Sequence, residues 1–141
     1  MSFLIVPFAA EHFRQIEVQK AQRAWIEHNA PALAAGPGQA HTVLIDGRPV
    51  ACGGVIELWP GRGYAWALLA DDSGPHMHRI TRTVRQFLDR APWRRVEMTV
   101  EAGFESGLRW ARLLGFTCET PQPMRGFAPH GADCYLFSRV R

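Results

Sequence analysis

Short segments in which apolar and polar residues alternate recur along the chain, separated by Gly, Pro and Asp. This period of two is typical of half-buried strands, and turn-forming residues mark where strands end. Between the second and third segments stands Asp46-Gly47, a dipeptide that favours a tight hairpin turn. The pattern predicts strands over residues 3–8, 42–45, 50–58, 64–69, 95–100, 116–120 and 134–140.

The clearest helix in the sequence has a different period. Apolar residues recur there at the steps of three and four that place side chains on one helical face, namely Met77, Ile80, Val84, Phe87 and Leu88. Pro75 stands at its start, where a helix tolerates the missing N–H, and Pro92 marks its end. We expect the apolar stripe to pack against the sheet.

Two other regions are predicted to be helical. One runs from about residue 104 to 114 and stops at Gly115. The other covers residues 10–35, where Phe13 and Ile16 form one apolar face and Trp25 belongs to another, so two short helices fit. The order strand, two helices, three strands, helix, strand, helix, two strands predicts one mixed α/β domain over residues 1–141.

Composition excludes several classes of protein. With 47% hydrophobic and 21% charged residues among 141, the chain is not extensively disordered. No apolar run reaches the roughly 18 residues of a membrane-spanning helix, and residues 1–7 lack the basic start and long apolar core of a signal peptide. We therefore expect a cytoplasmic protein that does not enter a membrane.

The cysteine content and the net charge restrict the possible functions less than the overall composition does. Cys52, Cys118 and Cys134 are odd in number and form no CxxC pair, so we expect buried thiols rather than disulfides or a zinc ribbon. Fifteen of the 16 cationic residues are arginines, and the net charge is +3. Arginine suits phosphate binding, but a net charge this small does not indicate nucleic acid.

A family resemblance enters with residues 109–116, Arg-Trp-Ala-Arg-Leu-Leu-Gly-Phe. This segment resembles the helix-then-Gly-Phe signature near the C-terminal end of GNAT-type N-acetyltransferases, and the element order is similar along nearly the whole chain. Residues 59–62 and 65–69 resemble the small GNAT-like proteins of phages and prophages. The resemblance implies a GNAT-like fold, with a mixed central sheet of about seven strands flanked by about four helices. It also implies acetyl-CoA as co-substrate, an amine acceptor and a homodimer.

The resemblance places the coenzyme along the fourth strand and at the start of the following helix. A helix N-terminus offers unpaired N–H groups and a positive dipole end to a pyrophosphate. The implied pyrophosphate site is Ser73, Gly74, Pro75, His76 and Met77, and the pantetheine arm would follow Trp66, Ala67, Leu68 and Leu69. Arg79 and Arg82 lie one to two turns further on, where they would meet phosphate charge.

The sequence departs from the family pattern at two places. Asp71 and His76 occupy the outer positions of the phosphate loop, where the family has Arg or Gln and Gly or Ala. Ala111 stands where many members carry the Tyr that protonates the leaving thiolate, and Phe104 matches a common Asn. An ordinary helix cap by Asp72 or Ser73 is the alternative to a phosphate site.

Acetyl transfer to an amine needs a base. Glu57 is the first candidate, because it ends an apolar strand beside Trp59, where a carboxyl pKa can rise. Glu101, directly after the fifth strand, is the second, and His76 is the third. His76 and His78 do not share a helix face, so no metal site is predicted.

Two other functions stay open. A GNAT-like protein without catalysis would act through protein contacts, as a virion component or on a host protein, and Ala111 and Asp71 favour that alternative. A nucleic-acid binder is suggested only by the arginines. The acceptor amine is not encoded in any recognisable motif, since residues 30–38 and 121–131, which would border it, carry none.

Overall fold

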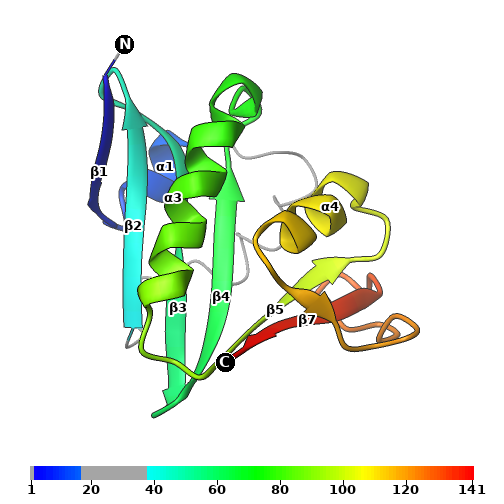
Figure 1. Cartoon of the computed structure of the whole chain (residues 1–141). Helices are drawn as coiled ribbons and strands as arrows, with labels where there is room; N and C mark the ends of the chain where they lie inside the picture. The colour runs from blue at the N-terminus through cyan, green and yellow to red at the C-terminus, as the bar shows by residue number, and fades with distance from the viewer. Residues whose placement is uncertain (1, 17–37) are drawn as a thin grey trace.

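The structure is a computed structural model that describes residues 2–16 and 38–141. One seven-stranded sheet runs in the order β1-β2-β3-β4-β5-β7-β6 (Figure 1). Its strands are β1 (Phe3–Pro7), β2 (Gly38–Ile45), β3 (Arg48–Trp59), β4 (Arg62–Leu69), β5 (Arg95–Glu101), β6 (Thr117–Cys118) and β7 (Cys134–Val140). The helices are α1 (His12–Gln15), α3 (Met77–Arg90), preceded by the 3₁₀ turn η2 (Gly74–His76), and α4 (Glu105–Leu113).

All seven predicted strands are confirmed, as is the Asp46-Gly47 hairpin between β2 and β3. The largest difference is at β2, which begins four residues earlier than predicted. Gly38 has a φ of 140°, and a Cβ there would lie 2.0 Å from the Val55 carbonyl oxygen, so only glycine lets the strand start opposite Ile56. Most of the predicted helical region 10–35 lies outside the described residues; within them, α1 is its only helix.

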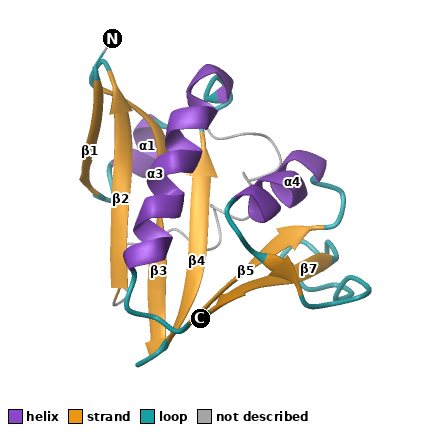
Figure 2. Cartoon of the chain, in the orientation of Figure 1, coloured by secondary structure: helices purple, strands orange, loops and turns teal. Residues whose placement is uncertain are grey.

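Helices cover both faces of the sheet. Figure 2 shows α3 crossing one face of β2, β3 and β4, α1 behind that sheet, and α4 beside β5 and β7. Ile80 and Leu88 of α3 are buried as the stripe predicted, but Val84 and Phe87 are only partly buried. In the described residues, no helix has the length and apolar character needed to cross a membrane.

The junction of β4 and β5 shapes the molecule. It is the one parallel pairing in the described sheet and covers only three residue pairs, from Arg62 opposite Arg95 to Tyr64 opposite Glu97. Beyond Tyr64 the strands diverge, and Figure 1 shows the gap between them widening toward α4. On its other edge β5 pairs with β7 in antiparallel fashion along its whole length, from Arg95 opposite Val140 to Glu101 opposite Cys134.

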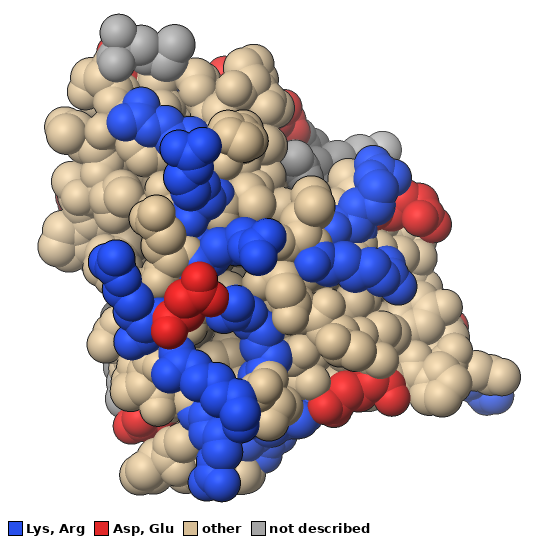
Figure 3. Space-filling model, viewed as in Figure 1, with Lys and Arg blue, Asp and Glu red and all other residues tan. Residues whose placement is uncertain are grey.

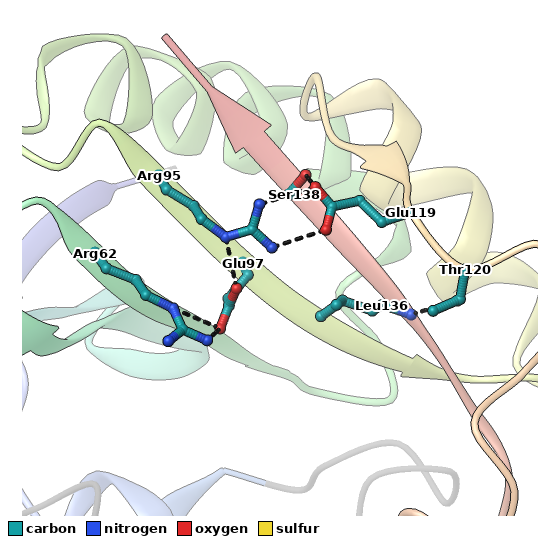
Figure 4. A network of polar contacts seen from close by, with 7 residues as sticks. All are labelled: Arg62, Arg95, Glu97, Glu119, Thr120, Leu136 and Ser138. Carbon is teal, nitrogen blue, oxygen red and sulfur yellow. Dashed lines mark hydrogen bonds and ion pairs between the residues drawn. The ribbon is translucent and has the colours of Figure 1, made fainter.

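A network of ion pairs crosses this junction (Figure 4). Glu97, only 5% exposed, accepts hydrogen bonds from Arg62 of β4 and, at 2.8 Å, from Arg95 of its own strand. Arg95 also forms two 2.8 Å hydrogen bonds to Glu119, which accepts a third from the Ser138 hydroxyl at 2.6 Å. Burial opposes ionisation of Glu97, but the two guanidinium groups outweigh it and lower its pKa.

The network predicts acid sensitivity. The hydrogen bonds from Arg95 and Ser138 lower the pKa of Glu119 to about 2, from 4.5 in an unperturbed carboxyl. A carboxyl with a depressed pKa stabilises the fold above pH 4.5, and this contribution is lost as the pH falls toward 2. We expect thermal melts to show a falling Tm over that range and Glu119→Gln to flatten the fall. Glu105→Gln, at an exposed carboxyl, is the control, and equal slopes for both variants would contradict the prediction.

Candidate active site

A cleft of about 560 Å³ lies where β4 and β5 separate. β4 and β5 form its floor, the start of α3 closes one end, and α4 forms the opposite wall. Residues from all four elements line it, including Ala65, Thr99, Gly74 and Arg109. The cleft opens where the short β4–β5 pairing ends, beyond Tyr64 opposite Glu97.

Ser73 points to a ligand at the α3 end of the cleft. It is 1% exposed and lines the cleft, yet its hydroxyl has no hydrogen-bond partner within the described part of the chain. Its side chain does not cap the helix, so the alternative of an ordinary Ser73 cap is not what the structure shows. Buried polar groups without partners are rare and commonly mark where a ligand or water binds.

The backbone around Ser73 leaves room for that ligand. A Cβ built on Gly74 meets no atom within 4 Å, so the space beside this glycine is open. Asp72 does not place uncompensated charge there, because Arg48 binds its carboxylate at 2.7 Å. The side chain of Asp72 is therefore engaged by β3 rather than by the helix.

The apex of the cleft, the end at which β4 and β5 meet, carries a pair of hydroxyl groups. The phenol of Tyr64, the last residue of β4 that pairs with β5, lies 2.8 Å from the hydroxyl of Thr99 on β5, so the two side chains join the strands at the point where they separate. Burial raises the pKa of Tyr64, and this outweighs the opposing hydrogen bond from Thr99. Tyr64 is therefore a neutral phenol at physiological pH, able to donate a proton into the cleft.

A carboxylate lies at the C-terminal end of β5. Glu101 lines the cleft, and its Oε1 lies 2.9 Å from Nε2 of His130, within ion-pair distance. His130 belongs to the loop between β6 and β7, so this contact fixes the loop to the rim of the cleft. Both side chains are partly exposed, 26% for Glu101 and 38% for His130, and can reach a ligand from solvent.

The structure brings together seven of the residues selected from the sequence. The cleft lining includes Trp66, Ala67, Leu69, Ser73, Gly74, Met77 and Glu101. It does not include Glu57, Leu68, Pro75, His76, Arg79 or Arg82. Leu68 is fully buried in the core instead, as expected for the next position on an alternating strand.

The excluded residues have other contacts. Glu57 accepts a hydrogen bond from the indole nitrogen of Trp93 at 3.0 Å, near the paired ends of β3 and β4. Arg79 stacks on the ring of Phe3 with 4.1 Å to its centroid, and Arg82 donates to His78. The geometry therefore favours Glu101 over Glu57 as the carboxylate available to a ligand in the cleft.

Arginine side chains gather on the face that carries α3 and α4 (Figure 3). The exposed arginines of these two helices are Arg79, Arg82, Arg85 and Arg90 of α3 and Arg109 and Arg112 of α4. Among these, Arg109 lines the cleft. The local sequence does not mark Arg109, Tyr64, Thr99 or His130, because only the tertiary fold brings them together.

Comparison with known proteins shows what fold this is. No family model and no curated protein matches the sequence. Solved structures do match it over almost its full length. An IAA acetyltransferase from Bacillus cereus has a TM-score of 0.71 at 11% identity, covering 99% of this chain and 100% of its own. A GNAT-family acetyltransferase from Bacillus anthracis has a TM-score of 0.70 at 10% identity, covering 99% and 95%.

The chain has the GNAT fold. A third structure, the ribosomal-protein-S5-alanine acetyltransferase from Vibrio fischeri, agrees with a TM-score of 0.65 at 13% identity, covering 99% of this chain and 93% of its own. The fold class expected from residues 109–116 and from the element order is thereby confirmed. At identities this low, the comparison establishes the fold, and the activity has to be argued from the cleft.

Proposed function

We propose that this protein transfers an acyl group, acetyl in the simplest case, from coenzyme A to an amine of a small molecule or protein. The observation that carries the proposal is the cleft between β4 and β5, with the unpartnered Ser73 hydroxyl at the end where α3 begins. A helix N-terminus favours a pyrophosphate, and Arg109 on the opposite wall adds a guanidinium for phosphate. The GNAT-fold acetyltransferases that match the chain support the same class of reaction.

The cleft supplies groups for both proton transfers. Glu101 is proposed to take a proton from the acceptor ammonium, directly or through water, so that the neutral amine attacks the thioester carbonyl. Tyr64 is proposed to protonate the departing thiolate from the apex of the cleft. This role falls to a β4 residue because the α4 position, Ala111, is a fully buried methyl group.

Gly74 provides the direct test of coenzyme binding. Gly74→Trp should fold, because the space beside Gly74 is open, and should raise the Kd for acetyl-CoA about tenfold or more by filling the proposed pyrophosphate site. Gly103→Trp is the matched control, since Gly103 also has open space beside it but does not line the cleft. Isothermal titration of the three proteins measures the effect. Unchanged binding by a folded Gly74→Trp variant would remove the coenzyme from this end of the cleft.

The second candidate is a GNAT-like binding module without catalysis, such as a virion component or a protein that engages a host factor. Ala111 favours it, because the family's usual proton donor is missing there. The two candidates differ in turnover rather than in coenzyme binding. Release of CoA thiol in the presence of a panel of amines supports the enzyme, whereas saturable acetyl-CoA binding without thiol release supports the module.

A further inference from the structure

A second cavity, of about 250 Å³, lies between α3 and the sheet. Its walls are mostly apolar side chains, including Val43 of β2, Val55 of β3 and Val84 and Phe87 of α3. The partial burial of Val84 and Phe87, which the stripe of α3 did not predict, follows from their position on this space. Burial there also raises the pKa of the Cys52 thiol to about 12, as expected in apolar surroundings.

The cavity adjoins the cleft. The two spaces share six lining residues, which are Ala65, Trp66, Ala67, Leu69, Met98 and Trp110. Two of these are alanines and one is a flexible methionine, so the partition on the strand side is made of small or adaptable side chains. On the helical side of the partition, the position of Trp110 is fixed, because its indole N–H donates to Thr81 Oγ1 on α3 at 2.8 Å.

Apolar walls of this kind bind water weakly, and the lining atoms lack close van der Waals contacts on the side that faces this space. A flexible apolar chain that enters from the cleft would restore them. At roughly 30 Å³ per carbon, about the share of one water molecule in the liquid, 250 Å³ corresponds to about eight carbons. The described residues of the lining include no Asp, Glu, Lys or Arg, so the occupant that they fit is a saturated hydrocarbon.

We propose that the acyl donor is a medium-chain acyl-CoA, with its chain of about six to eight carbons in the cavity beneath α3. This inference rests on the proposed function. The reaction is N-acylation: the acceptor nitrogen forms a bond to the acyl carbon, the C–S bond breaks, and the proton lost by the neutral amine ends on the sulfur of coenzyme A. The products are a medium-chain amide and free CoA thiol.

Titration of the full chain with CoA and with acetyl-, butanoyl-, hexanoyl- and octanoyl-CoA tests the proposal. The Kd should fall about fourfold for each methylene that enters the cavity, the equivalent of its transfer from water. Val84→Phe should abolish this gain while leaving the Kd for acetyl-CoA unchanged, because Val84 lines the cavity but not the cleft. Gln86→Phe, two residues further along the same helix and outside both spaces, is the matched control.

The possible results of these titrations each support or overturn the proposal. A Kd that stays constant from acetyl- to octanoyl-CoA in the wild-type protein overturns the proposal even if Val84→Phe does not fold. A gain that survives in folded Val84→Phe places the chain elsewhere and also overturns it. Failure of CoA and acetyl-CoA to bind at all removes the proposed function, and this inference with it. Val84→Ala enlarges the cavity, so the acyl-CoA with the lowest Kd should have a longer chain in this variant than in the wild-type protein.

Discussion

Glu101→Gln is expected to lower acyl-transfer turnover about 100-fold, the usual contribution of a positioned base, and to change the Kd for acetyl-CoA by less than about twofold. The carboxylate lines the cleft at the end of β5, where an acceptor amine can reach it from solvent, and it belongs to a different element from the proposed pyrophosphate site at the start of α3. Glutamine keeps the size of the side chain and one oxygen atom but does not act as a base. Steady-state rates of CoA release, with binding measured by titration, give both quantities.

The matched control is the same substitution at Glu57. That carboxylate binds the Trp93 indole and does not line the cleft, so Glu57→Gln should keep turnover within about threefold of wild type. Because both variants carry the same chemical change, comparing them shows whether Glu101 or Glu57 is the base. A large loss in Glu57→Gln and none in Glu101→Gln would restore the base selected from sequence position and refute the one selected from geometry.

The order and type of the elements could be predicted from the sequence because local signals determine them. The Asp46-Gly47 dipeptide fixes the hairpin between β2 and β3, and the apolar stripe from Met77 to Leu88 fixes α3. The start of β2 at Gly38 was missed, since a glycine preceded by proline indicates a turn unless the close approach to Val55 is known. Register and contact across strands are not local properties.

The cleft itself depends on contacts between distant residues. Tyr64 and Thr99 are 35 positions apart, and the same separation holds between Arg62 and Glu97. Ser73 and Gly74, which stand shortly after β4 in the sequence, lie beside the cleft in the structure. Glu57 does not line the cleft, and alternation along β3 does not reveal that the neighbouring β4 separates from β5 only beyond Tyr64. A residue's distance from that point of separation decides whether it can contribute to the site.

The ion pairs at that point should control both stability and the shape of the cleft. Glu97→Gln is expected to lower the free energy of unfolding by about 3 kcal/mol, because it leaves Arg62 and Arg95 facing each other without the buried carboxylate between them. Urea denaturation at neutral pH measures this effect, with exposed Glu105→Gln as control. A loss below about 0.5 kcal/mol, the usual range for a surface change, would show that the ion pairs of Glu97 with Arg62 and Arg95 are not essential to the junction.

The same variant tests how the junction and the cleft are linked. Only three residue pairs hold β4 to β5, and Arg62 and Glu97 belong to the first and the last of them. If the network fixes the angle at which the strands diverge, folded Glu97→Gln should also bind acetyl-CoA more weakly, although Glu97 does not line the cleft. Glu119→Gln is the matched control, because it removes a carboxylate from the β6 and β7 side of the network and leaves the Arg62–Glu97 contact in place. A folded Glu97→Gln variant with wild-type affinity would mean that the backbone pairing of β4 and β5 alone sets the opening.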